Sequence, residues 1–376
     1  MTYENKHYYL AFNCFQKIGP MATKRLENYF SDLKNAFTAS SFALEKAGLN
    51  PKLAGEFIAW RRNWRIENVL TELEKENISF ITWHDPEYPP LLKEISAPPP
   101  VLYYKGCSEE FAGKIKNRLA VVGSRQHSAY AEKIIAELLP PLIAAEIEII
   151  SGLALGIDAL AHHKTLDLKG KTWAILGSGL DAKNIYPSAN WRLAENIIAN
   201  GGLLLSEFPP GTPPYKQNFP QRNRIIAGLA QATLVVEAKA KSGALITAAY
   251  ALEQNREVLA IPGNIFSEFS AGPNDLIRSG AKTVINVDDI LEVFKLTSSA
   301  STPSKKLKAH SSYQPENQNE ATICNLLKSA EERAEALSAD EIIKNTKLDT
   351  ATINSTLSIL EIKGVISSAE FGYKLI

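Results

Sequence analysis

The run Leu119-Ala120-Val121-Val122-Gly123-Ser124-Arg125 decides the fold class, because it has the pattern of a short buried strand that ends in a tight glycine turn. Similar apolar runs recur along the chain, and segments with helical periodicity lie between them. The predicted strands span residues 119–122, 147–150, 173–176, 203–205, 234–236 and 258–261, and the predicted helices span residues 129–143, 157–168, 189–199 and 244–254. Short apolar strands that alternate with helices predict an α/β fold, built on a Rossmann-like, doubly wound and mostly parallel sheet.

Small and cationic residues follow several of these strands. The carboxyl ends of parallel strands meet at one edge of a sheet, where ligands gather. Glycines let the backbone approach a ligand closely, and Ser242 is placed to cap the helix that follows it. The candidate contacts after the strands are Gly123, Ser124 and Arg125, then Ser151 and Gly152, then Lys241, Ser242 and Gly243. Each turn alone also suits a tight strand-to-helix connection, so their convergence is what predicts an anion site.

The stretch Phe219-Pro220-Gln221-Arg222-Asn223-Arg224 follows a loop rich in proline and glycine and begins a short apolar helix. A guanidinium donates two hydrogen bonds to a phosphate at once and keeps its charge, and free N–H groups at a helix start add donors. An isolated Arg-x-Arg more often forms salt bridges, but its cationic neighbours favour phosphate. The predicted phosphate contacts are Arg125, Arg222, Arg224 and Lys241. Phe219 either stacks on a base or belongs to the core, and Asn223 either contacts the ligand or braces the loop.

Composition restricts the kinds of partner. The chain has 376 residues, enough for two or three domains, and its 41 Lys and Arg balance 41 Asp and Glu. Without a global positive field, a nucleic-acid site must come from a few well-placed charges. Cys14, Cys107 and Cys324 have no metal-ligand spacing, which predicts a reducing cytosol and no zinc site. No signal peptide or membrane-spanning run is evident, so we expect a cytoplasmic protein without a membrane partner.

Segments on either side of the core differ from it in pattern. Residues 1–66 have short amphipathic helices and a Gly turn similar to those of helix-hairpin-helix or SAM-like domains, and residues 67–111 form a proline-dense connector that packs on the core. The core spans residues 112–296, and the polar stretch 297–319 is predicted to be a flexible linker. Residues 320–376 have the pattern of a winged helix. Its predicted recognition helix lacks Lys and Arg, which favours protein interaction over duplex recognition.

The sequence gives little indication of catalysis. Asp158 and His162 are four residues apart and would share a helix face, either as a stabilising hydrogen bond or as an acid/base pair. No serine has a base partner and no carboxylate cluster indicates a metal, so we predict no catalytic residue, no metal and no cofactor. The alternatives are a Rossmann-like nucleotide hydrolase of the lysine-decarboxylase-like type, with Glu207 or Glu237 as its carboxylate, and a scaffold whose anion loops are vestigial.

Several motifs occur together in the same order as in one family. They are Val122-Gly123-Ser124-Arg125, the run from Ser151 to Asp158, Tyr186-Pro187 with Asn190, the run from Phe219 to Leu229, the run from Ser242 to Ala248, Ile261-Pro262-Gly263 and Gly280-Ala281. Over roughly residues 106–291 the chain therefore resembles the DNA-processing protein A family, DprA, also called Smf. Leu155 departs from the pattern, because the family often has Arg there.

The resemblance implies a single-stranded DNA binding protein that is indifferent to sequence. It also implies that the protein protects incoming DNA during natural transformation, works as a homodimer and helps to load the RecA recombinase. On this interpretation the protein is not an enzyme, and its DNA contacts are the residues predicted above.

Overall fold

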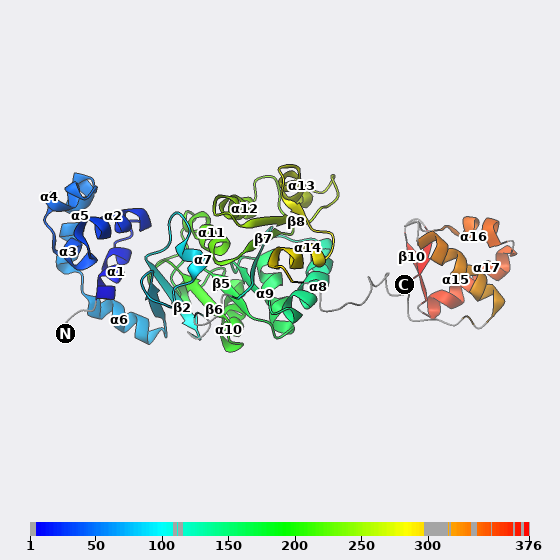
Figure 1. The fold of residues 1–376 in the computed structure, drawn as a ribbon. Helices are drawn as coiled ribbons and strands as arrows, with labels where there is room; N and C mark the ends of the chain where they lie inside the picture. The colour runs from blue at the N-terminus through cyan, green and yellow to red at the C-terminus, as the bar shows by residue number, and fades with distance from the viewer. Residues whose placement is uncertain are drawn as a thin grey trace. The chain divides into compact units, whose positions relative to one another are not determined.

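The computed structural model of the chain describes residues 5–107, 111, 116–296, 315, 317–331, 337–346, 348–363, 365–369 and 372–375. Contacts divide the chain into two units, Met1–Ser299 and Ala300–Ile376 (Figure 1). The larger unit contains the predicted sheet together with the N-terminal helices, and the smaller unit contains the winged-helix pattern. Most of the predicted linker at 297–319 lies outside the described residues, since only residues 315 and 317–319 belong to them.

The larger unit is built on one sheet, whose strands within the described residues have the order β1-β2-β6-β5-β4-β3-β7-β8-β9. The parallel strands are β3 (Arg118–Val122), β4 (Glu148–Ser151), β5 (Thr172–Ile175), β6 (Leu203–Ser206), β7 (Ala232–Val235), β8 (Glu257–Ala260) and β9 (Lys282–Thr283). An antiparallel pair, β1 (Ser79–Thr82) and β2 (Val101–Gly106), extends the sheet beyond β6. The predicted Rossmann-like, mostly parallel α/β fold is thus confirmed, and the proline-rich connector supplies two of its strands.

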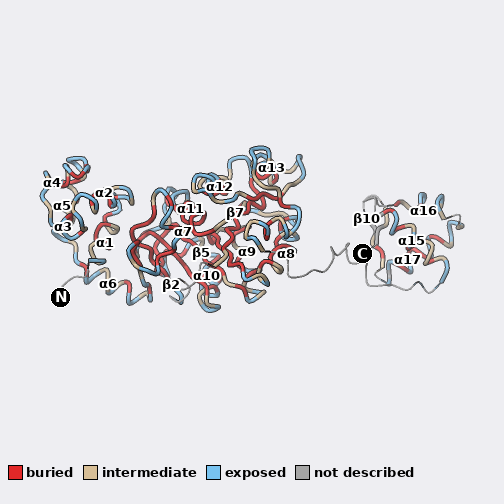
Figure 2. Tube along the Cα trace, viewed as in Figure 1, coloured by how far each residue is buried: buried red, intermediate tan, exposed pale blue. Residues whose placement is uncertain are grey.

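The two faces of the sheet bury different helices, because successive side chains on a strand point to opposite sides. Leu119 and Val121 of β3 belong to the cluster that contains α8 (Ala129–Ala144), α9 (Ile157–Asp167) and α14 (Asp288–Leu291). Ala120 and Val122 belong to the cluster that contains α10 (Trp191–Ala199), α11 (Asn218–Leu229) and α12 (Gly243–Glu253). The strands are therefore covered on both sides, as the continuous buried trace in the centre of Figure 2 shows. The helix α13 (Ala271–Arg278) follows β8.

A topological switch point lies in the middle of this sheet. From β3 the chain steps through β4 and β5 to β6 on one side, then returns to place β7 on the other side of β3. The loops after β3 and β7 consequently lead to opposite faces of the sheet, and such a divergence opens a crevice at the carboxyl ends of the strands.

Short helices form the N-terminal part of the larger unit. They are α1 (Asn5–Cys14), α2 (Pro20–Phe30), α3 (Leu33–Thr38), α4 (Ser41–Lys46), α5 (Pro51–Asn63) and α6 (Ile66–Lys75), followed by α7 (Pro90–Lys93) between β1 and β2. Asp32, Ser40 and Asn50 cap α3, α4 and α5 by accepting backbone N–H hydrogen bonds, which stabilises helices this short. Phe12 and Phe57 stack at the centre of this part, in the same apolar cluster as the sheet.

The smaller unit is a winged helix. Its helices α15 (Gln318–Glu331), α16 (Ala339–Thr346) and α17 (Thr350–Ile362) are followed by the hairpin of β10 (Ile366–Ala369) and β11 (Gly372–Leu375). Ile323, Ile342 and Leu360, one from each helix, are fully buried in its own core. Across the described residues of both units, no helix has the length and apolar character that a membrane crossing requires.

The buried imidazole of His162 leads to a prediction about acid stability. Its Nδ1 lies 2.7 Å from Thr172 Oγ1 inside the sheet, and burial lowers its pKa to about 3, with smaller effects from the charges of His163 and Arg222. The unfolded chain therefore binds this proton more readily than the folded chain does. This difference does not lower the free energy of unfolding above about pH 6.5, the ordinary pKa of a histidine in the unfolded chain. Below that pH the free energy of unfolding falls by about 1.4 kcal/mol per pH unit, until the pKa of the folded state is reached.

We expect urea unfolding followed by tryptophan fluorescence to show this loss between pH 6.5 and 5, and to show a shallower pH dependence for His162→Gln. Equal pH dependence in the two proteins would show that His162 is not the source.

Candidate nucleic-acid interface

A cavity of about 460 Å³ lies at the switch point, bounded by the carboxyl end of β3 and by the starts of α11 and α12. A smaller recess of about 30 Å³ adjoins it and shares Arg125, Phe219 and Arg222. Of the residues predicted from the sequence, those that line one or both are Gly123, Arg125, Gly152, Phe219, Arg222, Asn223, Ser242 and Gly243. Turns from separate parts of the chain therefore converge here, as the strand-end argument predicted.

The turn after β3 is held in place by backbone hydrogen bonds from two directions. Ser124 N–H donates to the carbonyl of Glu237 at 2.7 Å, and Ile157 N–H donates to the carbonyl of Ser124 at 3.1 Å. Gly156 makes the second contact possible, because its φ is +78° and a Cβ there would lie 2.2 Å from the Ser124 carbonyl oxygen. The backbone that carries Arg125 at the cavity wall is therefore fixed in position.

Two rings and an exposed cation form the mouth of the cavity. The ring of Tyr186, which is 45% exposed, lies 5.5 Å from the half-buried ring of Phe219, centroid to centroid. The guanidinium carbon of Arg125 lies 5.7 Å from the centroid of Phe219. Phe219 thus lines the cavity and is partly accessible, and does not lie wholly inside the core. Rings beside a cation are the groups that contact the bases and phosphates of a single strand.

Arg222 provides a buried positive charge beneath this surface. It is 4% exposed, its Nη1 donates to the carbonyl of Gly152 at 2.7 Å, and its Nε has no hydrogen-bond partner. Burial lowers its pKa to about 10, so it remains protonated at neutral pH. Asp158 balances this charge, and it also accepts hydrogen bonds from the backbone N–H groups of Gly152 and Ala154. Burial raises the pKa of Asp158 while Arg222 opposes the rise.

Arg224 does not line the cavity. Its Nη1 and Nη2 donate to the two carboxylate oxygens of Glu207 at 3.0 and 2.6 Å, and both side chains are buried. The physical reason is helix geometry: α11 already begins at Asn218, so Arg222 and Arg224 lie about 200° apart around its axis. The sequence placed both arginines at the mouth of the helix, but they point to different sides. The geometry of Arg224 is that of a structural ion pair, and we leave it out of the DNA contacts proposed below.

Of the three predicted serine contacts, two are buried and one caps a helix. Ser124 and Ser151 are buried; Ser151 Oγ donates to the carbonyl of Val121 at 2.6 Å, and Ser124 Oγ accepts from Gln126 N–H. Ser242 caps α12, as predicted, by accepting a hydrogen bond from Ala244 N–H.

Asn223 braces the starts of two helices, because its Nδ2 donates to the carbonyl of Gly243 at 3.1 Å. Lys241 is exposed on the turn before α12 and does not line the cavity.

Some lining residues were missed by the sequence analysis. Tyr186 belongs to the Tyr186-Pro187 motif but was not predicted as a contact, and Lys216 lies in the proline loop three residues before Phe219. Leu155, 45% exposed, lines the small recess at the position where a family arginine was noted. A lysine so close to the aromatic motif was a usable signal. The sequence offered no such signal for Tyr186, because this residue lies in a different loop, the one after β5.

The possible catalytic groups are engaged in other contacts, although Asp158 lines the cavity. Asp158 faces backbone amides and Arg222, whereas His162 faces Thr172, so the expected hydrogen bond between Asp158 and His162 does not form. Glu237 accepts hydrogen bonds from Ser128 and, like the paired Glu207, does not line the cavity. The hydrolase alternative is therefore not favoured. Within the described residues, no three His, Cys, Asp or Glu side chains gather as a metal site would require.

The chain is similar to known families and proteins over most of its length. Residues 79–295 match the family model of DNA recombination-mediator protein A, and residues 308–370 match that of the DprA winged helix domain. Protein Smf from Synechocystis sp. is 42% identical over 294 residues, which cover 77% of this chain and 73% of that protein. The DNA processing protein DprA from Bacillus subtilis is 40% identical over 228 residues, 61% of this chain and 75% of that protein.

Solved structures give the same result. DprA from Streptococcus pneumoniae superposes with a TM-score of 0.65 at 35% identity, covering 78% of this chain and 98% of that one. DNA processing protein A from Helicobacter pylori, described for its single-stranded DNA binding mode, gives a TM-score of 0.51 at 26% identity and covers 58% of this chain and 95% of that one. With both family models matched in chain order and these relatives covered over most of their length, the chain belongs to the DprA/Smf family of DNA recombination-mediator proteins.

Proposed function

We propose that this protein binds single-stranded DNA through the cavity at the switch point. The observation that carries the proposal is the convergence of the Tyr186–Phe219 ring pair with exposed Arg125 and Lys216, above the buried charge of Arg222. Single-strand binders use cations along the backbone and rings that stack on bases. Contacts of both kinds are present within one cavity, in a chain whose net charge is zero.

The same groups support binding that is indifferent to base sequence. Guanidinium and ammonium groups recognise phosphates, and an aromatic face accepts any base. Asn223 is the amide of the cavity best suited to read a base edge, but its Nδ2 is engaged by the carbonyl of Gly243. We therefore expect similar affinity for oligonucleotides of different base composition, with modest preferences set by stacking strength.

The direct test is binding of labelled single-stranded oligonucleotides over a salt series. The cations on and near the cavity, Arg125, Lys216, Lys241 and the buried Arg222, predict about four phosphate contacts and a log–log salt slope of about −3 for a single strand. A wild-type protein that does not bind, or that binds duplex more tightly than the single strand, would overturn the proposal.

Within the family's recombination role, we propose that the protein protects incoming single strands in natural transformation and helps to load RecA onto them. It acts by binding and not by turnover. Nuclease protection of a bound strand, and the rate of RecA filament formation on protein-coated DNA, test the two activities separately. If RecA assembles no faster with the protein than without it, the loading role is wrong while DNA binding stands.

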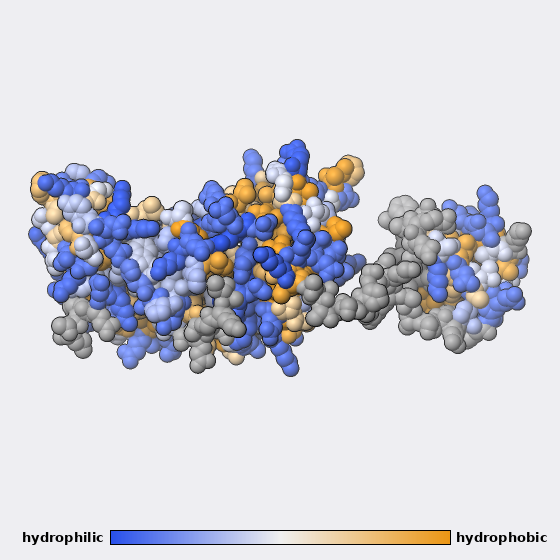
Figure 3. Space-filling view, in the orientation of Figure 1, coloured by the Kyte–Doolittle hydropathy of each residue, from blue (hydrophilic) through white to orange (hydrophobic). Residues whose placement is uncertain are grey.

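We also propose that the protein is a homodimer. Apolar side chains gather on the surface of the core near α12 and α13 (Figure 3), and Ile265 and Phe266 in the loop after β8 are 81% and 90% exposed. Leu252 and Ile285 are exposed as well. An apolar patch of this kind is typical of an interaction site. Light scattering should give a dimer mass for the wild type and a shift towards the monomer for Phe266→Glu; a monomeric wild type would contradict the assignment.

The winged helix is proposed to contact a protein partner. The exposed positions on α17 include Asn354, Ser355, Ser358, Ile359 and the acidic Glu361. Recognition helices of duplex-binding domains need basic or amide side chains towards the groove. Among the described positions of α17 the exposed side chains include no Lys or Arg, and Asn354 is the one amide. This composition supports protein contact over duplex DNA.

A further inference from the structure

Polar contacts connect the N-terminal helices to the loops that carry the ring pair. Gln16, just after α1, donates from Nε2 to Thr212 Oγ1 at 2.8 Å. Asn13, near the end of α1, donates from Nδ2 to the carbonyl of Glu207 at 3.0 Å. Glu76, just after α6, accepts from Ala182 N–H at 3.1 Å. All these partners belong to the loops after β5 and β6.

Each of these loops leads directly to one of the rings. The loop after β6 passes from Glu207 through Thr212 and Lys216 to Phe219, and the loop after β5 passes from Ala182 to Tyr186. The loops are also joined to each other, because Gly211 N–H donates to Asp181 Oδ1 and Gly179 N–H donates to the carbonyl of Thr212. A contact at Thr212 or Ala182 therefore helps to hold both loops in place, and with them both rings.

The loop after β6 depends on side-chain contacts more than an ordinary loop does. Pro209, Pro210, Pro213 and Pro214 have no N–H group, so they donate no backbone hydrogen bonds. Prolines also restrict the backbone, so a few contacts are enough to define the conformation of the loop. The contact from Gln16 falls between the two proline pairs.

Asn13 extends the connection into the core of the sheet. Its Oδ1 accepts a hydrogen bond from the hydroxyl of Tyr103, a fully buried residue on β2, while its Nδ2 contacts Glu207. The Glu207 carboxylate in turn holds Arg224 on α11, the helix that carries Phe219 in its first turn. One amide therefore aligns α1 with the sheet and with the base of α11.

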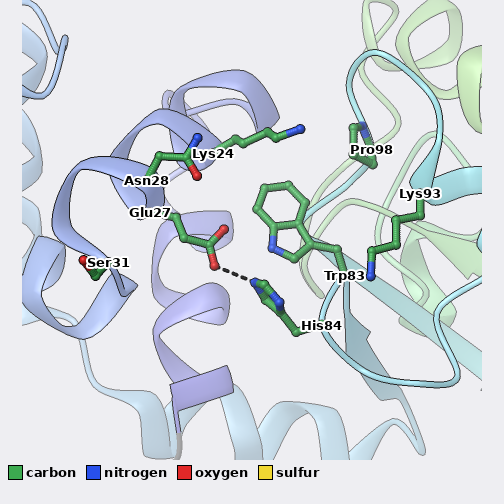
Figure 4. A pocket seen from close by; sticks show the side chains of 8 residues that line it. All are labelled: Lys24, Glu27, Asn28, Ser31, Trp83, His84, Lys93 and Pro98. Atoms are coloured by element: carbon green, nitrogen blue, oxygen red, sulfur yellow. Dashed lines mark hydrogen bonds and ion pairs between the residues drawn. The ribbon is translucent and has the colours of Figure 1, made fainter.

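The α2 side of the same junction is more open. A cleft of about 480 Å³ separates α2 from the segment between β1 and α7, with Lys24, Glu27, Trp83 and Lys93 on its walls (Figure 4). His84 contacts Glu27 across it, as the dashed line in Figure 4 shows. The contacts that reach the loops after β5 and β6 come from α1 and from the residues just after α1 and α6, and not from α2.

From these contacts we propose that the N-terminal helices brace the Tyr186–Phe219 ring pair in the geometry that stacks on bases. Gln16, Asn13 and Glu76 are positioning residues: they hold the loops and do not touch DNA themselves. This inference rests on the proposed DNA site and extends it, because it gives the N-terminal part of the chain a role in affinity that does not require it to touch DNA.

The test compares Gln16→Ala with Asn35→Ala, a matched control. Asn35 lies on α3 and its amide contacts the carbonyl of Phe30 within the N-terminal helices, away from the loops. We expect Gln16→Ala to bind a single-stranded oligonucleotide roughly three- to tenfold more weakly, the effect of losing one neutral hydrogen bond, with an unchanged salt slope. Asn35→Ala should bind as the wild type does.

Two further readouts separate positioning from general damage. In a Phe219→Ala background, Gln16→Ala should cause little additional loss, because the ring through which it acts is already absent. Amide hydrogen exchange of residues 205–219, measured without DNA, should be faster in Gln16→Ala and unchanged in Asn35→Ala.

An additive loss in the double variant, or unchanged exchange in Gln16→Ala, would overturn the brace. A wild type that fails to bind DNA would instead refute the proposed function. In that case the hydrogen-exchange experiment alone would test whether the N-terminal helices brace the loops.

Discussion

Replacing Arg224 with alanine is expected to lower the free energy of unfolding of the larger unit by about 3–5 kcal/mol, because it leaves the Glu207 carboxylate buried without its partner. The two side chains are 7% and 5% exposed and are joined by a bidentate ion pair. Urea unfolding measures the loss. All five tryptophans lie at or before Trp191, so their fluorescence reports on the larger unit without interference from the winged helix.

The pH dependence of this defect identifies its cause. Burial already raises the pKa of Glu207, and Arg224 opposes that rise. Without Arg224 the folded-state pKa rises further above its unfolded value, so the folded protein holds this proton more tightly. The defect should therefore shrink as pH falls, when Glu207 takes up the proton, and be largest at neutral pH and above.

The neutral pair Glu207→Gln with Arg224→Met serves as the control, since it removes both charges and should recover much of the lost stability. If Arg224→Ala were as stable as the wild type and lost only DNA affinity, the ion pair would be dispensable. Arg224 would then return to the set of phosphate contacts that the sequence predicts.

Replacing Phe219 with alanine is expected to weaken single-stranded DNA binding by about 1–3 kcal/mol, roughly five- to 150-fold, through loss of base stacking. Because no charge is removed, the salt slope should not change. Arg125→Ala should do the opposite: its loss of affinity should come with a slope flattened by about 0.7, the contribution of one phosphate contact. Both side chains lie at the cavity mouth. Within the described residues of the larger unit, Arg125 has no buried ionic partner.

A ring outside the cavity provides the comparison for Phe219. Phe42 on α4 is 66% exposed and does not line the cavity, so Phe42→Ala should leave binding unchanged. Similar affinity in the Phe219→Ala and wild-type proteins would remove the ring from the site. Arg222→Ala is a poor test of phosphate contact, because it would leave the carboxylate of Asp158 buried and unbalanced.

The order of strands and helices in the core was predictable because the signal is local. Runs such as Leu119-Ala120-Val121-Val122 are apolar over their whole length, since a parallel sheet covered on both faces buries every side chain. The edge of the sheet that carries the site followed from the same rule. The strands outside the predicted set include β9, which has only two residues, and β2, which follows a run of prolines that drew the prediction towards a connector.

The sequence alone thus determined the α/β class, the winged helix and the edge of the sheet at which glycine turns and cations meet, because periodicity and strand-end chemistry are local properties. Only the tertiary structure decided which cations face the cavity. Because α11 begins at Asn218, the side chains of Arg222 and Arg224 point to different sides of the helix. Tyr186 and Gln16 reach the site through contacts between segments that are distant in the sequence. Local patterns do not encode such contacts, since the direction of a side chain depends on helix register and on the packing of neighbouring elements.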